Sequence, residues 1–299
     1  MFEVKELHGV LPALISPLTR EGAVDEPAVR RLVEHVLAGG VHGLLPLGST
    51  GEMASLDEPA RRQVLAAVVE AAAGRVPVIC GVAQTHLAAA RAEVQAAARQ
   101  GAMAVLVAPP FYYPIDQATV LGFYRRLAAD SPLPILVYNI PQNTKVVVEP
   151  DTVGALAHEG TVVGIKDSSR DFEYFERVLL ATRDLPGFRA FTGSDTMLMA
   201  SVAMGGCGTI CGAANVAPGL VVSVYEAAAR GDWDAARTRQ DRLIEVVMAV
   251  REGVFPAAIK AGVAMQGVCE PWPMPPVPAL NEAATERLRQ KLEGLLAPV

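Results

Sequence analysis

The stretch VVGIKDSS, residues 162–169, is a short apolar run that ends in a lysine and three further polar residues. A continuous apolar run, without polar alternation, is typical of a parallel strand that is covered on both faces. Lys166 stands at the C-terminal end of that expected strand, where burying an ammonium group would be costly. Either the amine reaches water at the strand end, or its pKa is lowered for a chemical purpose.

Similar apolar runs recur along the chain and alternate with stretches that have helical spacing. With the run just quoted, they lie at 10–15, 43–47, 76–82, 103–107, 134–138, 162–165, 188–191 and 208–211. Their spacing of roughly 20 to 35 residues fits one strand and one crossover helix, with Asp57 and Thr85 as expected helix N-caps.

Eight such units predict an α/β fold, a (β/α)8 TIM barrel over residues 1–230. A doubly wound open sheet is the alternative, because periodicity alone does not distinguish an open sheet from a closed one. Three more helical stretches follow, and they predict a C-terminal helical extension over residues 231–299 that packs on the barrel.

Composition excludes several classes of protein. The chain has 299 residues, 51% of them hydrophobic, and a formal net charge of -6, which argues against a nucleic-acid surface. No apolar stretch reaches the roughly 18 residues of a membrane span, and the N-terminus lacks the features of a signal peptide. The four cysteines form no CxxC pair, and the five histidines have no ligand spacing. We therefore expect a cytoplasmic protein without a metal site.

Two polar segments follow expected strands, where a barrel collects its functional groups. The sequence GSTGE at 48–52 places Ser49 and Thr50 between glycines, and such a turn can present N–H groups and hydroxyls to a carboxylate. The alternative is an ordinary turn that caps a helix.

Tyr138 ends the fifth run, beside the sixth if strand order follows the sequence. Its phenol could carry protons to and from a carbonyl-derived centre, or it could be a strand-end tyrosine with a solvated hydroxyl.

Lys166 is one of only five lysines and the only one that ends an apolar strand. A desolvated amine has a lowered pKa, so more of it is neutral and able to attack a ketone to form a Schiff base. The alternative is an ordinary ion pair with Asp167 at the rim of the barrel.

Taken together, six motifs in order along the chain resemble the dihydrodipicolinate synthase / N-acetylneuraminate lyase family. They are GSTGE at 48–52, PPFYYP at 109–114, YNIP at 138–141, GIKDSS at 164–169, GSD at 193–195 and ANVAP at 214–218. The resemblance implies a (β/α)8 barrel with C-terminal helices, pyruvate or another 2-oxo acid as substrate, no metal or organic cofactor, and a homotetramer built as a dimer of dimers.

The resemblance also implies roles for individual residues. Lys166 matches the lysine that forms the imine, and Tyr138 the tyrosine that relays protons. Ser49 and Thr50 match the pair that holds the substrate carboxylate and passes protons to that tyrosine. Tyr112 resembles the tyrosine that reaches into a neighbouring subunit, although the adjacent Tyr113 is an alternative. The substrate-binding residues expected on this basis are Gly48, Ser49, Thr50, Asn143, Ser168, Gly193 and Ile210.

The sequence departs from the lysine-biosynthetic branch of that family at Asn143, where the branch has an arginine that grips a distal carboxylate. This departure and the KDSS motif favour an aldolase of 2-keto-3-deoxy sugar acids or 4-hydroxy-2-oxoglutarate, with Asn143, Ser168 and Ser169 meeting a hydroxylated partner. Lys145 could supply charge instead, which leaves 4-hydroxy-tetrahydrodipicolinate synthase, condensing pyruvate with aspartate semialdehyde, as the alternative. A catalytically silent barrel that binds a 2-oxo acid is the alternative of another class.

Overall fold

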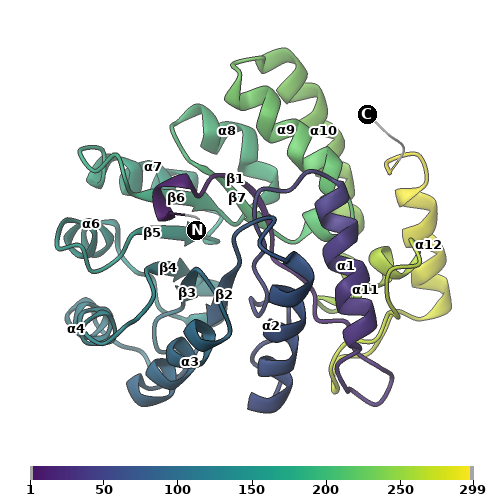
Figure 1. Cartoon of the computed structure of the whole chain (residues 1–299). Coiled ribbons are helices and arrows are strands. Elements are labelled where there is room, and N and C mark those ends of the chain that lie inside the picture. The colour runs from purple at the N-terminus through teal and green to yellow at the C-terminus, as the bar shows by residue number, and fades with distance from the viewer. Residues whose placement is uncertain (1–2, 297–299) are drawn as a thin grey trace.

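The computed structural model describes residues 3–296, so the outermost ends of the two predicted domains, 1–2 and 297–299, lie outside the described residues. Its centre is a curved sheet of seven parallel strands (Figure 1). The strands are β1 Gly9–Pro12, β2 Ile79–Val82, β3 Ala104–Val107, β4 Ile135–Asn139, β5 Gly164–Asp167, β6 Arg189–Thr192 and β7 Gly208–Cys211. The predicted α/β class with a parallel sheet is confirmed.

Strand order follows the chain from β2 to β7, and β1 then pairs with β7. Every pairing is parallel, so the carboxyl ends of all seven strands meet at one edge of the sheet. In the register of β4 and β5, Tyr138 lies directly opposite Lys166. The expected adjacency of these two residues is therefore confirmed.

The second apolar run differs from the prediction, because no strand forms there. Its residues instead make single parallel bridges, Leu45 to Ala13 and Leu44 to Val78. The Leu45 N–H donates to the carbonyl of Pro12 at 3.0 Å, and the Ile79 N–H donates to that of Leu44 at 2.9 Å. The run thus bonds to both edges of the sheet. The bridged pairing ends after Leu45, because Pro46 has no N–H to donate and Leu47 turns the chain at a φ of 60°.

Side chains alternate between two cores along each strand. In β4, Ile135 and Val137 pack outward among the helices, whereas Leu136 and Tyr138 point into the interior of the curved sheet. The interior core includes Leu11, Leu45, Ile79, Leu106, Phe191 and Ile210. Because Lys166 is the register partner of Tyr138, it faces the same interior.

Helices cover the outer face of the sheet (Figure 1). They are α1 Glu26–Ala38, α2 Glu58–Ala72, α3 Leu87–Arg99, α4 Gln117–Ala128, α6 Pro150–His158, α7 Phe172–Ala181, α8 Leu198–Ala203 and α9 Pro218–Ala229. The short helix α5 Pro141–Thr144 follows β4, and 3-10 turns lie at Val4–Glu6, Asp195–Met197 and Ala213–Asn215. Asp57 caps α2 as expected, accepting from the Ala60 N–H. The expected cap Thr85 is wrong, since the ring of His86 accepts from the Ala89 N–H at 3.3 Å.

Three further helices follow, as the sequence predicts: α10 Trp233–Ala249, α11 Ala257–Ala264 and α12 Glu282–Leu292. In Figure 1, α10 runs beside α9, and α12 packs against α11. Over residues 3–296, none of the helices is long and apolar enough to cross a bilayer.

Candidate active site

The side chains of Lys166 and Tyr138 meet inside the sheet, at the carboxyl ends of β5 and β4. The Lys166 Nζ donates to the Tyr138 Oη at 3.5 Å, and it lies 4.5 Å from the centre of the ring. Each residue is only 3% exposed. An amine and a phenol in contact, both shielded from bulk water, are suited to exchange a proton during chemistry at the amine.

A serine hydroxyl extends this contact. The Ser49 Oγ lies 3.2 Å from the Tyr138 Oη, and either atom could donate. Ser49 belongs to the turn between Leu47 and α2, which is tied to the protein interior by the hydroxyl of Ser16, a donor to the Gly51 carbonyl at 2.7 Å. Amine, phenol and serine hydroxyl therefore form one continuous polar chain.

Thr50 lies beside this chain rather than within it. Its side chain is buried and borders the same cavity as Lys166. Among residues 3–296, the side-chain hydrogen-bond partners of the Tyr138 hydroxyl are Lys166 and Ser49. The direct link to the tyrosine thus comes from Ser49, whereas the resemblance implied that both hydroxyls pass protons to it.

Most of the predicted site residues border one cavity of about 360 Å³. They are Ser49, Thr50, Tyr138, Asn143, Lys166, Ser168, Gly193 and Ile210. The chain segments that carry them are far apart in sequence and converge because each follows or ends a strand of the sheet or, for Ser49 and Thr50, follows the run that bridges its two edges. The cavity is open to solvent at the end where the strands stop.

Gly193 shows why one wall of this cavity carries no side chain. A Cβ at this position would lie 2.0 Å from the Ser168 Oγ and 2.9 Å from the Lys166 Cε. Such distances are far shorter than real contacts, so any larger residue would displace the lysine. Glycine here leaves room for the amine.

Two predicted residues stand outside the cavity. Gly48 is buried, and a Cβ there would meet the side chain of Leu45 at 2.9 Å, so its role is packing within the turn. Tyr112 is 79% exposed and stacks edge-to-face on Tyr113 with 5.0 Å between ring centroids. It borders no wall of the cavity within this chain.

Lys145, which could have supplied a positive charge to the site, lies away from the cavity. Its Nζ donates to the carbonyl of Gln142 at 2.7 Å on the surface, and it does not border the cavity. Ser169 is also turned away, since its Oγ donates to the Asp167 carboxylate at 2.9 Å. Of the residues expected to meet a distal group, only Asn143 and Ser168 line the cavity.

Asp167 does not form the ion pair with Lys166 that we considered as the alternative reading of the lysine. Its carboxylate accepts from the Asn139 amide at 2.8 Å and from Ser169. The strand alternation points it away from the interior, among buried groups, and that burial raises its pKa. The carboxylate instead joins the ends of β4 and β5, while the amine faces the cavity.

The structure adds site residues that the sequence reasoning missed. Arg170, directly after KDSS, lines the cavity, and so does Arg251 from the loop after α10. The first could have been found from its place beyond a strand end. No spacing in the sequence pointed to the second, because only folding brings α10 to the open end of the sheet.

A buried ion pair supports the turn that carries Ser49. Lys260 of α11 is fully buried, and its Nζ lies 2.5 Å from the Glu52 Oε2 and donates to the carbonyl of Trp272 at 2.7 Å. The other carboxylate oxygen of Glu52 accepts from the Met274 N–H at 2.7 Å. Helix α11 and the segment that follows it therefore hold the GSTGE turn in place.

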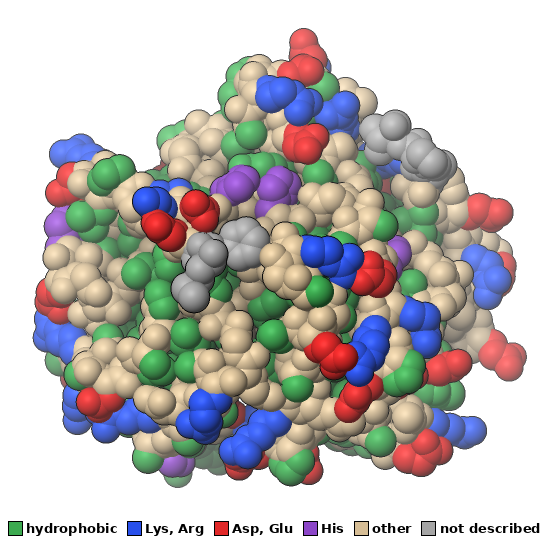
Figure 2. Space-filling view, in the orientation of Figure 1, with side chains coloured by type: hydrophobic (Ala, Val, Ile, Leu, Met, Phe, Trp, Pro, Cys, Tyr) green, Lys and Arg blue, Asp and Glu red, His purple; other side chains and the backbone are tan. Residues whose placement is uncertain are grey.

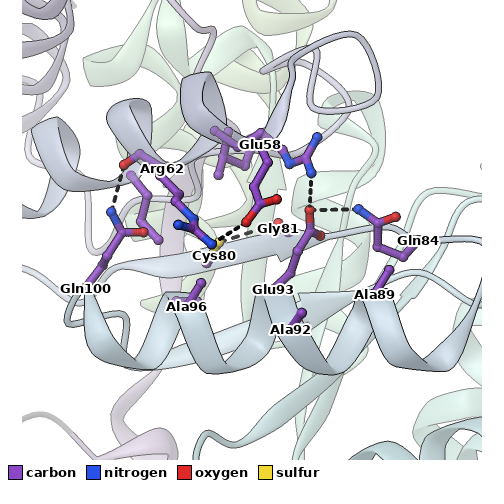
Figure 3. Close-up of a pocket in the computed structure, with 14 residues that line it drawn as sticks. Glu58, Arg62, Cys80, Gly81, Gln84, Ala89, Ala92, Glu93, Ala96 and Gln100 are labelled. Carbon is purple, nitrogen blue, oxygen red and sulfur yellow. Dashed lines mark hydrogen bonds and ion pairs between the residues drawn. The ribbon is translucent and has the colours of Figure 1, made fainter.

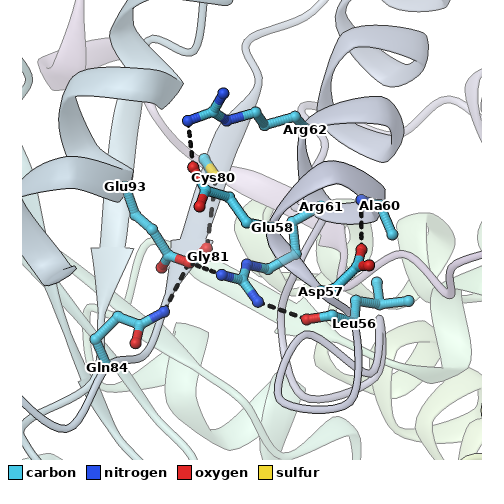
Figure 4. Close-up of polar contacts among 10 residues, drawn as sticks. All are labelled: Leu56, Asp57, Glu58, Ala60, Arg61, Arg62, Cys80, Gly81, Gln84 and Glu93. Atoms are coloured by element: carbon cyan, nitrogen blue, oxygen red, sulfur yellow. Dashed lines mark hydrogen bonds and ion pairs between the residues drawn. The ribbon is translucent and has the colours of Figure 1, made fainter.

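A second cavity, of about 190 Å³, lies between α2 and α3 (Figure 3). Its charged side chains are engaged with one another. Arg61 pairs with Glu93 at 2.7 Å, and Glu93 also accepts from Gln84, as Figure 4 shows. Burial raises the pKa of the Cys80 thiol at its floor to about 12, which leaves it un-ionised and poorly nucleophilic. This cavity therefore offers packing and surface pairing rather than a reactive group.

The charges on the surface do not gather into a patch of one sign on the face shown in Figure 2, where Lys/Arg and Asp/Glu side chains are interspersed. Within residues 3–296, no three His, Cys, Asp or Glu side chains lie close enough together to hold a metal ion.

Comparisons with known proteins agree with this geometry. The model of the dihydrodipicolinate synthetase family matches residues 6–295. A 4-hydroxy-tetrahydrodipicolinate synthase of Phenylobacterium zucineum is 39% identical over 279 residues, which cover 93% of each chain. An uncharacterized DapA-like lyase of Halobacterium salinarum is 37% identical over 261 residues, covering 87% of this chain and 85% of the relative.

Solved structures give the same result. A prophage protein of the dihydrodipicolinic acid synthase family from E. coli K12, determined in complex with pyruvate, has a TM-score of 0.93 and 26% identity, covering 97% of this chain and 98% of its own. A structure described as the first monomeric dihydrodipicolinate synthase variant has a TM-score of 0.93 and 28% identity, covering 98% of each chain.

Proposed function

The chain belongs to the dihydrodipicolinate synthetase family, and from this premise we propose that it is a class I aldolase or lyase in which Lys166 forms an imine with the ketone of pyruvate or another 2-oxo acid. The observation that carries the proposal is the contact of the buried Lys166 amine with the Tyr138 hydroxyl at the wall of an open cavity. A protein that only binds a 2-oxo acid would gain nothing from a phenol held against a nucleophilic amine.

The proposed reaction begins when the neutral amine of Lys166 adds its lone pair to the ketone carbon. The carbinolamine then loses water, with Tyr138 donating the proton that the leaving hydroxide needs. The protonated imine withdraws electrons, so either the bond between C3 and C4 breaks while the C4 hydroxyl gives its proton to the Tyr138 phenolate and an aldehyde is released, or the phenolate removes a C3 proton. Both routes give an enamine, which is reprotonated or adds to an aldehyde before water hydrolyses the imine.

Ser49 and Thr50 are proposed to hold the C1 carboxylate of the substrate. Both border the cavity on the turn before α2, which carries hydroxyls and backbone N–H groups. Ser49 also contacts Tyr138, so the hydroxyl chain can return to the tyrosine the proton that it gives away. Binding of the carboxylate and proton relay would thus be coupled through one side chain.

Trapping with borohydride tests the proposal directly. Incubation with pyruvate and borohydride should reduce the imine and add a stable pyruvyl mass to the peptide that contains Lys166. Lys166→Ala should abolish the labelling, and Lys145→Ala serves as a control, because it removes an exposed lysine that does not border the cavity. Labelling of Lys166→Ala at the wild-type level would refute the assignment. A wild-type protein that binds pyruvate without any trapped mass would favour the catalytically silent barrel.

The substrate beyond pyruvate is proposed from the sequence and the relatives together. Asn143 and Ser168 at the cavity support an aldolase of 2-keto-3-deoxy sugar acids or of 4-hydroxy-2-oxoglutarate. Relatives named 4-hydroxy-tetrahydrodipicolinate synthase, at 39% identity and below, support the biosynthetic alternative. Rates of pyruvate release from a panel of 2-oxo acids, compared with condensation of pyruvate and aspartate semialdehyde, distinguish the two.

We also propose that the bridged run 43–47 acts as the second of eight strands, closing a (β/α)8 barrel over 1–230, with 231–299 as its helical extension. The bonds from this segment to both sheet edges support closure. Slow amide exchange at Leu45 and Ile79, comparable to that within β4, is the expected result. Exchange as fast as in a surface loop would indicate an open sheet.

The assembly is a proposal of its own. Tyr112 and Tyr113 are large, adjacent and exposed, which supports a surface that a second copy covers in a homotetramer. Light scattering of the purified protein measures its oligomeric state, and a monomer with full activity would contradict the expected role of Tyr112 in a neighbouring site.

The four unpaired cysteines support a reducing, cytoplasmic location.

A further inference from the structure

Two arginines border the active cavity without an acidic partner. Within residues 3–296, Arg170 makes no ion pair, and the Arg251 guanidinium contacts only the sulfur of Met248 at 3.6 Å. Arginines elsewhere on the surface commonly pair with carboxylates, as Arg75 does with Glu34. Both cavity arginines are therefore free to bind an anion that enters from solvent.

In the described part of the chain, the acidic residues at the same cavity form no ion pair with either arginine. Glu252 is already paired with Arg287 at 2.6 Å and with Lys291 at 3.3 Å. Asp195 directs one carboxylate oxygen to the Ala213 N–H at 3.0 Å. The carboxylates of Glu252 and Asp195 thus bond to other parts of the chain. The guanidinium groups of Arg170 and Arg251 have no acidic partner among the described residues.

The backbone of Arg170 gives a second, independent indication. Its φ is 66°, in the left-handed region that glycine adopts readily and residues with a Cβ adopt only with strain. Nothing about the turn requires a side chain there, because glycine would satisfy the geometry better. A strained residue that persists at the rim of a site is most simply explained by the function of its side chain.

We propose that Arg170 and Arg251 form an anion subsite at the open end of the cavity, which selects 2-oxo acids carrying a second carboxylate several carbons from the ketone. The inference rests on the proposed function, because it places the ketone at Lys166. Lys166 is 3% exposed at the closed end, whereas both arginines are exposed at the mouth. A substrate bound through its ketone would extend from the amine toward them.

This subsite takes the place of the distal arginine that Asn143 lacks. A guanidinium group can bind a carboxylate through two parallel hydrogen bonds, which neutral side chains cannot match. The expectation of a hydroxylated partner therefore gives way to a dicarboxylate. 4-Hydroxy-2-oxoglutarate has the second carboxylate, as does the adduct of pyruvate with aspartate semialdehyde, but 2-keto-3-deoxygluconate does not.

The test compares two probes of similar length that differ in the charge of the far end, 2-oxoglutarate and 2-oxohexanoate. For each, the concentration that gives half-maximal borohydride trapping at Lys166 is measured by intact mass. Wild-type protein should need at least tenfold less 2-oxoglutarate than 2-oxohexanoate. Arg170→Gln and Arg251→Gln should each raise the 2-oxoglutarate concentration by about tenfold to a hundredfold and leave 2-oxohexanoate within twofold.

Three controls isolate the subsite. Arg177→Gln removes the same charge from an exposed position on α7 outside the cavity and should change neither probe. Arg170→Gly relieves the strained φ and should fold at least as well as wild type, while losing the preference for the dicarboxylate. Trapping with pyruvate alone, which has no distal group, should be unchanged in every arginine variant.

The outcomes separate the two proposals. If wild-type protein does not trap pyruvate, both the proposed function and the subsite are wrong. Normal pyruvate trapping without a preference for 2-oxoglutarate, or equal losses on both probes in the arginine variants, overturns the subsite alone. Loss of the preference in Arg177→Gln as well would show that only the overall charge matters.

Discussion

At the scale of single residues, the site depends on which way two neighbouring side chains point. Lys166 and Asp167 are adjacent in sequence, but the strand sends one into the interior and the other outward. The amine therefore gains a phenol as its partner, and the carboxylate gains the amide of Asn139. A shift of register by one residue would exchange them and leave a carboxylate facing the cavity.

Tyr138→Phe removes one hydroxyl and should keep the fold, because the ring remains in the interior core. The loss of proton transfer should lower kcat by about 10²- to 10⁴-fold, while pyruvate still binds. Ser49→Ala, which leaves the phenol in place, should cost less. Turnover of pyruvate-releasing cleavage measures both, and a Tyr138→Phe enzyme with near wild-type kcat would make Tyr138 a packing residue.

At the scale of elements, helix α11 supports the catalytic turn through one buried pair. Glu52 adopts a φ of 57°, and its carboxylate is held by Lys260 and the Met274 N–H. Burial lowers the pKa of Lys260, although the Glu52 charge opposes that shift. The pair fixes the position of the turn, because moving either side chain would leave the other charge buried without a partner.

Lys260→Met should destabilise the protein by about 3–5 kcal/mol, because it leaves the Glu52 carboxylate buried without its partner. Adding Glu52→Gln removes that uncompensated charge while retaining an acceptor for the Met274 N–H, so the double variant should regain part of the loss. Urea unfolding of the two single variants and the double variant measures the coupling. Strictly additive losses would show that the two side chains do not act as a pair.

At the scale of the whole molecule, two partly buried histidines link stability to pH. Burial lowers the pKa of His35, which its bond to the Asn215 carbonyl partly opposes. Burial, together with the nearby His8, lowers the pKa of His42. Below about pH 6.5 the unfolded chain takes up protons at these positions that the folded chain does not, so unfolding becomes more favourable on acidification.

Stability should therefore be full above about pH 7 and fall progressively between about pH 6.5 and 5. His35→Gln, which keeps a donor for the Asn215 carbonyl, should reduce that fall. His158 is the matched contrast: its bond to the Gly154 carbonyl and its pairing with Asp184 raise its pKa, so its contribution is present at low pH and lost as pH rises. Urea midpoints at pH 7.5 and 5.5 measure the slope, and an unchanged slope in His35→Gln would contradict the assignment.

The sequence by itself determined the parallel α/β class, the three C-terminal helices and the adjacency of Lys166 and Tyr138, whereas the contact of Ser49 with Tyr138 was implied only by the family resemblance. These follow from local signals, since apolar runs and caps define elements, and parallel strands place their ends together. The sequence also suggested a helix cap at Thr85, but His86 caps α3 instead. The two residues are neighbours, and only the path of the backbone decides which of them stands at the cap position.

Only the tertiary structure decided that the second run forms bridges rather than a strand, that Lys145 and Ser169 turn away from the cavity, and that Arg251 and Lys260 reach the catalytic end. Arg251 lies in the loop after α10 and Lys260 lies on α11, both beyond the last strand of the sheet. Their positions depend on how α10 and α11 pack against the rest of the molecule, which is set by contacts between distant segments and leaves no period or spacing in the sequence.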